Sequence, residues 1–189
     1  MNHRNGLVRR YTVYTSHGDR LSHACEMPEL VRTSPNGQHM AHTTPLKHIM
    51  SSEITCAAPD LDLPALVERM LRERLGCIPV VDRHRRPIGI ITKRDLVDLV
   101  GAQLLDSAPG ERSDDLRTRT ADELMMPMPV TLSESSSVAD AAMLMAKEGF
   151  HHVLVVSEDG RLCGVLTSHD IVTWLADEDV VASAARQML

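Results

Sequence analysis

The sequence predicts an α+β fold built from two repeats that are related by a pseudo-twofold axis and packed sheet to sheet. The first observation is an internal duplication. Residues 76–100 align with residues 151–175 at an offset of 75 positions without a gap, and seven of the 25 aligned pairs are identical. The second is that each copy contains short, wholly apolar runs, which are typical of strands buried on both faces. The third is size: a unit of about 55 residues has a marginal core, so two copies should pack on each other.

Each copy is predicted to run strand, helix, strand, strand, helix. The first helix is indicated by apolar residues at helical spacing, namely Leu63, Leu66, Val67 and Met70 in one copy and Val138, Ala141, Ala142 and Met145 in the other. Asp62 and Ser137 precede these faces, and both residue types are favoured N-caps.

The three strands of each copy are short apolar runs. They are ITC or VTL, then CIPVVD or HVLVVS, then IGIIT or CGVLT, and the turn sequences RHRRP (83–87) and EDGR (158–161) separate the last two. The copies also begin alike, with LKHIMSSEIT (46–55) against DELMMPMPVT (122–131), an alignment that requires one residue of slippage.

Composition divides the chain into five parts. Residues 1–44 form a polar arm that we expect to be flexible, with one short strand at Tyr11–Thr15. The remaining parts are the first repeat, the polar linker SAPGERSDDLRTRT, the second repeat and the C-terminal tail, with expected ranges 45–106, 107–120, 121–178 and 179–189.

Charge and composition exclude several classes of function. A net charge of −6 and only four aromatic residues argue against nucleic acid as a partner. No apolar run approaches the ~20 residues of a membrane span, and the N-terminus lacks the apolar region of a secretory signal. The four cysteines form no C-x-x-C pair, which is typical of packing cysteines in a reducing compartment. We therefore expect a cytoplasmic protein without membrane or nucleic-acid partners.

A Thr-x-x-Asp motif ends the third strand of each copy, in GIITKRDLV (89–97) and GVLTSHDIV (164–172). A capping box at the start of the next helix explains this spacing by itself. The same geometry also suits a ligand, since a helix N-terminus attracts phosphate, a threonine hydroxyl can donate to it, and an aspartate can accept from ribose hydroxyls. Gly89 and Gly164 would let a flat base approach the backbone. The spacing leaves both interpretations open.

The duplicated segments CIPVVD…RPIGIITKRDLVDLV and HVLVVSEDGRLCGVLTSHDIV resemble the cystathionine-β-synthase (CBS) domain, which occurs in tandem pairs. The likeness covers about residues 45–176. It implies a regulatory module, not an enzyme, with no catalytic residues and no catalytic cofactor. The implied ligand is adenosine-containing (AMP, ADP or ATP, with S-adenosylmethionine or NAD as alternatives), the implied assembly is a disk-like homodimer, and a separate regulated protein supplies the output.

The resemblance also implies two ligand sites, each shared between the copies. One combines Thr167 and Asp170 with the first strand and the pre-PVV segment of the other copy, that is, with Ile54 and with Gly76, Cys77 and Ile78. The other combines Thr92 and Asp95 with Val130, His151, His152 and Val153. In both, the threonine is expected to contact phosphate and the aspartate ribose.

The two sites differ in charge. Lys93 and Arg94 follow Thr92, whereas Ser168 and His169 follow Thr167. With His151 and His152 opposite, the Thr92 site is expected to hold the polyphosphate, and the Thr167 site to bind more weakly or to prefer an uncharged tail. Solvated side chains that never face a ligand are the alternative for Lys93 and Arg94.

Two other functions remain open from the sequence. The repeats could form an oligomerising adaptor without a ligand, in which both Thr-x-x-Asp motifs are only capping boxes. Alternatively, the histidine-rich arm could bind a metal, with His39, His42 and Cys25 as candidate ligands, although their spacing matches no established pattern.

Overall fold

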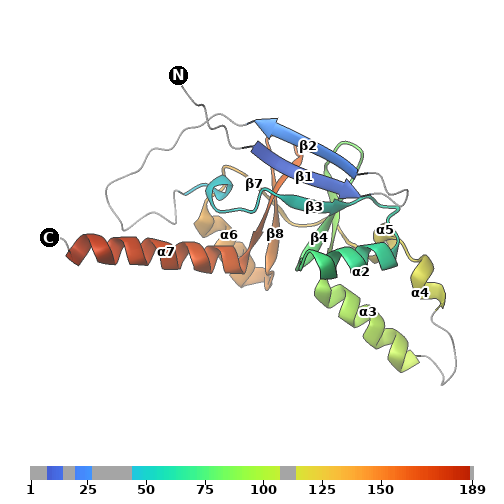
Figure 1. The fold of residues 1–189 in the computed structure, drawn as a ribbon. Coiled ribbons are helices and arrows are strands. Elements are labelled where there is room, and N and C mark those ends of the chain that lie inside the picture. The colour runs from blue at the N-terminus through green and yellow to red at the C-terminus, as the bar shows by residue number, and fades with distance from the viewer. Residues whose placement is uncertain (1–7, 15–19, 27–43, 107–113, 188–189) are drawn as a thin grey trace. The chain divides into compact units, whose positions relative to one another are not determined.

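The structure is a computed structural model that describes residues 8–14, 20–26, 44–106 and 114–187 (Figure 1). By contacts between Cα atoms the chain forms two compact units. Unit 1 comprises residues 1–10, 24–54 and 130–189, and unit 2 comprises residues 11–23 and 55–129. Each unit is therefore assembled from segments that are far apart in the sequence.

Unit 2 contains the strands and helices of the first repeat. Strand β3 (Ile54–Ala57) pairs in parallel with β4 (Cys77–Val81), which pairs antiparallel with β5 (Pro87–Thr92), and β5 pairs with the short β6 (Met126–Pro127). The helices are α2 (Leu63–Arg72), α3 (Lys93–Asp106), α4 (Asp114–Thr118) and α5 (Ala121–Leu124). The predicted order of strand, helix, strand, strand, helix is present.

Unit 1 contains the corresponding elements of the second repeat. Strand β7 (Thr131–Ser133) pairs in parallel with β8 (His152–Val156), which pairs antiparallel with β9 (Leu162–Thr167). Its helices are the 3₁₀ turn η1 (Leu46–His48), α6 (Val138–Glu148) and α7 (Ser168–Gln187). The mixed α+β class predicted from the sequence is confirmed.

The N-terminal arm contributes two strands, β1 (Val8–Tyr14) and β2 (Arg20–Glu26), where the sequence predicts one at Tyr11–Thr15. The six-stranded sheet has the order β2-β1-β3-β4-β5-β6, so β1 lies beside β3. The sequence does not predict the second strand, because the apolar residues of the arm do not alternate over a length that identifies a strand by itself.

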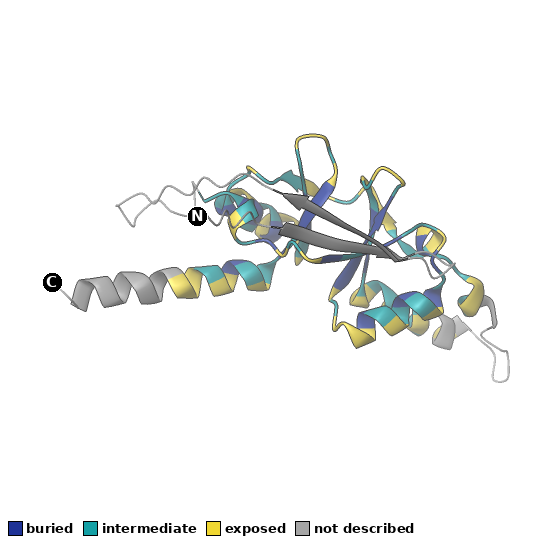
Figure 2. Cartoon of the chain, turned by 45° about the horizontal axis from the view of Figure 1, so that its top comes forward, coloured by how far each residue is buried: buried dark blue, intermediate teal, exposed yellow. Residues whose placement is uncertain are grey.

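Each unit has its own apolar core beneath the first helix of its repeat. In unit 2, Leu66 and Met70 of α2 pack with Ile78 and Ile91 of the sheet. In unit 1, Val138 and Met145 of α6 pack with Val153 and Leu166. The caps predicted for both helices are confirmed, since the Asp62 carboxylate accepts from the Ala65 amide at 2.8 Å and Ser137 forms a capping box with Asp140. The helices accordingly show one buried and one exposed side (Figure 2).

The two segments that lead into the repeats pack on the opposite repeat. We call residues 44–51 and 119–126 the lead segments. In unit 1 the Val138 amide donates to the Thr44 carbonyl at 2.9 Å, and Leu46 and Met50 join the core of the second repeat. In unit 2 the Leu63 amide donates to the Arg119 carbonyl at 2.9 Å, and Ala121 joins the core of the first. The lead segments are thus exchanged.

The backbone pairing keeps the offset of 75 positions across the whole repeat. The pair Ser51–Val165 of unit 1 corresponds to the pair Met126–Ile90 of unit 2. In the same way, the pair Ala57–Val80 corresponds to the pair Leu132–Val155. The slippage of one residue that the sequence suggested is therefore wrong. One consequence is that Thr55, not Ile54, is the structural equivalent of Val130.

No helix among the described residues has both the length and the apolar character needed to cross a membrane.

Candidate functional site

The Thr-x-x-Asp motif of the first repeat joins β5 to α3 through reciprocal hydrogen bonds. The Thr92 amide and hydroxyl both donate to Asp95 Oδ2, at 2.7 and 2.8 Å, and the Asp95 amide donates to Thr92 Oγ1 at 3.3 Å. This is the capping box predicted from the spacing, and the carboxylate at the start of the helix also suits its dipole.

The second repeat reproduces this arrangement between β9 and α7. The amide and hydroxyl of Thr167 donate to Asp170 Oδ2, both at 2.7 Å, and the Asp170 amide donates to Thr167 Oγ1 at 3.1 Å. The two helix starts therefore have the same geometry, and they differ only in the side chains around them.

The hydrogen bonds limit what each motif can offer to a ligand. The single hydroxyl proton of Thr92 points to Asp95, so the hydroxyl would have to turn away from the carboxylate before it could donate to a phosphate. The second carboxylate oxygen, Asp95 Oδ1, is not used by the capping box and can accept from a ribose hydroxyl. The carboxylate is thus better prepared for binding than the threonine.

The residues before β4 and β8 lie against the motif of their own repeat. The Lys93 amide donates to the Gly76 carbonyl at 3.1 Å, and Cys77 pairs with Thr92 across the ladder. Ile78 is fully buried and Ile54 is nearly so, which limits both to backbone contacts with a ligand. The predicted combinations across the two repeats stay predictions.

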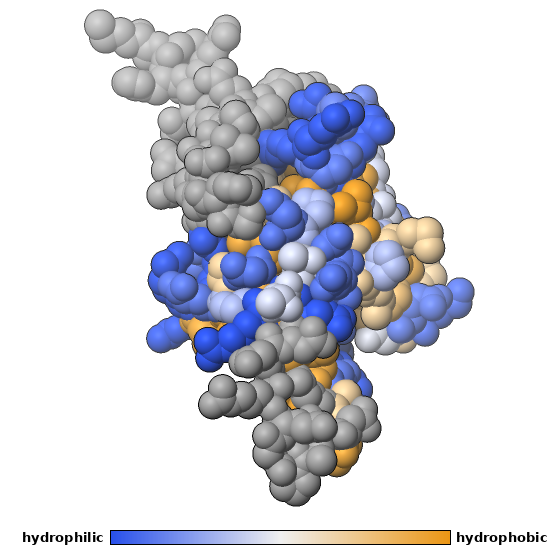
Figure 3. All heavy atoms as spheres, turned by 90° about the vertical axis from the view of Figure 1, so that its right-hand side faces the viewer, coloured by the Kyte–Doolittle hydropathy of each residue, from blue (hydrophilic) through white to orange (hydrophobic). Residues whose placement is uncertain are grey.

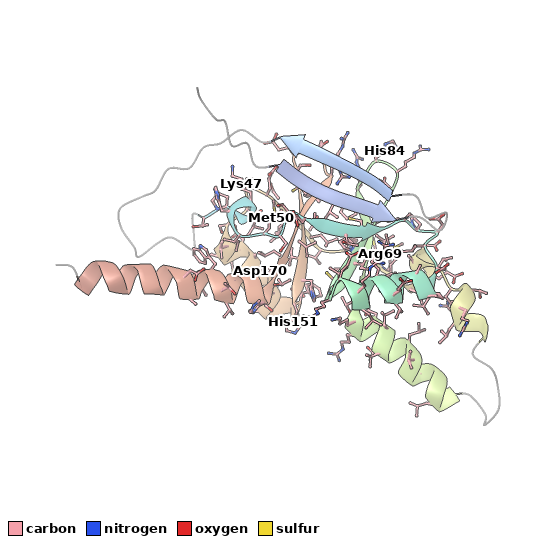
Figure 4. All side chains as sticks on the ribbon, viewed as in Figure 1. Lys47, Met50, Arg69, His84, His151 and Asp170 are labelled. Atoms are coloured by element: carbon pink, nitrogen blue, oxygen red, sulfur yellow. The ribbon has the colours of Figure 1, made fainter. Side chains whose placement is uncertain are left out.

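Histidines surround the motif of the second repeat. The Ser168 amide donates to the His151 carbonyl at 3.1 Å, and His152 pairs with Thr167 across the ladder. Figure 4 shows His151 and Asp170 near the start of α7. Burial and the neighbouring His151 lower the pKa of His152, while Asp170 acts in the opposite direction. With the exposed His169, three imidazoles lie close to this helix start.

The other predicted site residues differ in exposure. Lys93 and Arg94 are exposed at the start of α3, and Arg94 lies 3.8 Å from Asp98, a surface ion pair within the helix. Val130 is 37% exposed, whereas Val153 is fully buried. Lys93 and Arg94 are therefore accessible to an anion.

Gly89 and Gly164 have a different role from the one expected. A Cβ added at Gly89 would lie 2.1 Å from Met125 Sδ, and one at Gly164 would lie 2.1 Å from Met50 Sδ. Both methionines belong to the lead segments, and Met50 is labelled in Figure 4. On the side of its absent Cβ, each glycine thus accommodates a methionine and not a flat base, because only a residue without a side chain leaves that room.

The described residues contain no cluster of metal ligands, and two of their buried thiols are unreactive. Burial raises the pKa of both Cys56 and Cys77 to about 12, so neither thiol is a nucleophile at neutral pH. No group of three or more His, Cys, Asp or Glu residues there could hold a metal ion. His39 and His42 lie outside the described residues.

Comparison with known proteins matches the chain to one family model. The CBS domain model matches twice, at residues 46–102 and 121–177. An uncharacterised 17.7 kDa protein of Acidianus ambivalens is 25% identical over 71% of this chain and 74% of its own length. Uncharacterized protein MK0525 of Methanopyrus kandleri is 28% identical over 64% of this chain, but the match spans only 57% of that longer protein.

Solved structures agree with this fold. CBSX2 in complex with AMP has a TM-score of 0.59 at 22% identity, over 71% of this chain and 97% of that one. The CBS domain pair of protein MJ0100, in complex with 5'-methylthioadenosine and S-adenosyl-L-methionine, has a TM-score of 0.59 at 24% identity, over 72% and 98%. The CBS domain of a bacterial CNNM/CorC family Mg²⁺ transporter, in complex with ATP, has a TM-score of 0.59 at 21% identity, over 72% and 89%.

Proposed function

Because the chain belongs to the CBS domain family, we propose that it is a regulatory module that binds an adenosine-containing ligand and signals its level to a partner protein. The observation that carries this proposal is the pair of Asp95 and Asp170 carboxylates. Each is fixed at a helix start and keeps one oxygen outside the capping box. The ligands of the related structures, which are AMP, ATP and S-adenosylmethionine, share the ribose that such an oxygen would accept from.

The proposed signal is a shift between conformations. A ligand that interacts with both repeats would favour one arrangement of them over others, and a partner that recognises that arrangement would supply the output. We propose that the module acts in the cytoplasm as a homodimer and that it catalyses no reaction.

We further propose that the Thr92 site takes the polyphosphate. Lys93 and Arg94 are exposed beside its capping box, where Ser168 and His169 stand in the other repeat. ATP titrations of Asp95→Ala and Asp170→Ala test this order. Asp95→Ala should weaken ATP binding at least tenfold and Asp170→Ala much less. If Asp170→Ala weakens ATP binding more than Asp95→Ala does, the assignment of the polyphosphate to the Thr92 site is wrong, although nucleotide binding itself is still supported.

A thermal-shift panel of AMP, ADP, ATP, S-adenosylmethionine, NAD and cyclic dinucleotides tests the proposed function as a whole. A ligand that binds only the folded state must raise the melting temperature by mass action. Guanosine nucleotides with the same phosphates serve as the control for non-specific charge effects.

If no compound of this panel raises the melting temperature, the result would favour the second candidate, an oligomerising adaptor. The observation in favour of that candidate is that the Thr92 and Thr167 hydroxyl protons already serve the capping boxes.

A further inference from the structure

Unit 2 contains an open cavity of about 270 Å³ on the side of α3 that faces α5. Three leucines, Leu96, Leu99 and Leu124, provide its apolar lining, and Asp95, Asp98, Arg119 and Glu123 complete it. Figure 3 looks onto the side of the molecule that Figure 1 draws at the right, where apolar surface lies among hydrophilic side chains. We call this cavity the α3 groove.

The equivalent positions of the second repeat show which side chains this part of the fold accommodates. At the offset of 75 positions, Leu99 of α3 corresponds to Trp174 of α7, and Leu124 corresponds to Ile49. Trp174 and Ile49 both pack against the core of unit 1. The position that a large aromatic ring fills in the second repeat is therefore held by a smaller leucine in the first. A flat ring is the shape that this local architecture accommodates.

Charge distinguishes the two positions as well. Asp98 and Glu123 correspond to Thr173 and His48, so the α3 groove has two carboxylates that the second repeat lacks there. One of these carboxylates forms an ion pair with Arg119, whose Nε lies 3.0 Å from Glu123 Oε2. The side chain of Asp98 is 71% exposed and lies 3.8 Å from Arg94 Nε, whose side chain is 89% exposed. A pair that open is weak, so Asp98 stays available to another cation.

We propose that the α3 groove is the docking site for a partner protein, which inserts an aromatic side chain adjacent to a lysine or arginine. The ring packs on Leu96, Leu99 and Leu124, and the neighbouring cation meets Asp98 at the rim. Aromatic anchors with nearby positive charge contribute most of the energy in many protein interfaces. Of the groove lining, Asp95 also belongs to the proposed nucleotide site, but the ring contacts the three leucines and the cation meets Asp98, so the docking does not require a bound nucleotide.

Two peptides test the proposal directly, acetyl-Trp-Lys-Lys-amide and its acidic counterpart acetyl-Trp-Glu-Glu-amide. Binding to the full chain is measured by calorimetry, and the site by chemical-shift changes of the leucine methyl groups. The basic peptide should bind with a dissociation constant on the order of 1 mM or tighter, at least tenfold tighter than the acidic one, and perturb Leu96, Leu99 and Leu124. Equal binding of both peptides, or shifts elsewhere, would overturn the proposal.

Matched substitutions at equivalent positions provide the controls. Leu99→Trp fills the groove and should abolish peptide binding, while the ATP thermal shift is retained. Trp174→Leu leaves the groove intact and should bind the peptide as the natural chain does; if it unfolds, Trp174→Phe replaces it. Asp98→Asn should remove the preference for the basic peptide. Unchanged binding by Leu99→Trp contradicts the assignment, and binding of tryptamine without binding of the peptide would assign the groove to a small amine and not to a protein.

Discussion

In the proposed function, Asp95 and Asp170 each have two roles that sequence spacing alone could not separate. One carboxylate oxygen accepts two hydrogen bonds from the threonine three residues earlier, which fixes the start of the helix. The other oxygen lies outside the capping box, and in the proposed function it accepts from the ligand. Loss of either aspartate should therefore affect both folding and binding, and Asn, which keeps an acceptor oxygen, is the better substitution for separating them.

His152 should make stability depend on pH. Its pKa lies below the ordinary value of 6.5, chiefly because of burial and then because of His151. Since the unfolded chain then binds the proton more tightly than the folded one, stability is complete above about pH 6.5 and is lost as the pH falls toward the folded pKa. Urea denaturation at several pH values between 8 and 5 should show this decline.

The variant His152→Gln should flatten that part of the profile, and His84→Gln, in the exposed turn after β4, should follow the natural chain. An identical slope in all three proteins would mean that other groups control acid stability. A phosphate-bearing ligand near His152 should also reduce the decline, because an anion favours the protonated imidazole.

At the scale of elements, the lead segments are held by glycines in the last strand of each repeat. Gly89→Ala would place a Cβ 2.1 Å from Met125 Sδ and 2.7 Å from Met125 Cβ, so the segment must move. We expect a loss of about 1–3 kcal/mol in the free energy of unfolding. Chemical denaturation of Gly89→Ala, Met125→Ala and the double variant measures the coupling.

The double variant should lose less stability than the sum of the single variants, because the smaller side chain removes the clash. Gly101→Ala is the control, since a Cβ there meets nothing within 4 Å. In a helix interior this change should stabilise by about 0.5–1 kcal/mol. Strict additivity of the Gly89 and Met125 effects would refute the contact.

The sequence predicts the elements of the two repeats well and their partners poorly. The strands, the Asp62 and Ser137 caps and both Thr-x-x-Asp boxes follow from local patterns, and the structure contains all of them. The exchange of the lead segments could not be predicted, because an apolar residue such as Met50 indicates burial but not the repeat that buries it. Backbone register is equally hidden in the sequence, because the offset of 76 positions matches apolar residues such as Ile54 and Val130 better than the true offset of 75 does.

At the scale of the whole molecule, corresponding faces of α3 and α7 expose apolar residues. Val97 is 68% and Val100 48% exposed on α3, while Val172 is 61% and Leu175 46% exposed on α7. Val97 corresponds to Val172 and Val100 to Leu175 at the offset of 75 positions, so α3 and α7 expose equivalent apolar faces. Repeated apolar surface of this kind is typical of an interface, and it supports the proposed homodimer.

Sedimentation velocity should detect a dimer of the natural chain, and Val97→Lys and Val172→Lys should each shift it toward monomer. A lysine at either position places a charge in an apolar interface at a cost large enough to weaken association at least tenfold. Glu158→Lys, in the exposed turn between β8 and β9, is the control for added charge. A dimer that survives both substitutions would place the interface elsewhere.

The exchange of the lead segments also sets an order for events on the ribosome. Leu46 and Met50 are synthesised early, yet the core that buries them includes Val153, Leu166 and Ile171, which follow more than 100 residues later. The main block of unit 2 is complete at residue 129, about 40 residues before Ile171 is synthesised. At roughly 5–20 residues per second, the first lead segment waits for several seconds with its apolar side chains uncovered. During that interval the nascent chain is open to capture by a chaperone or by a neighbouring copy.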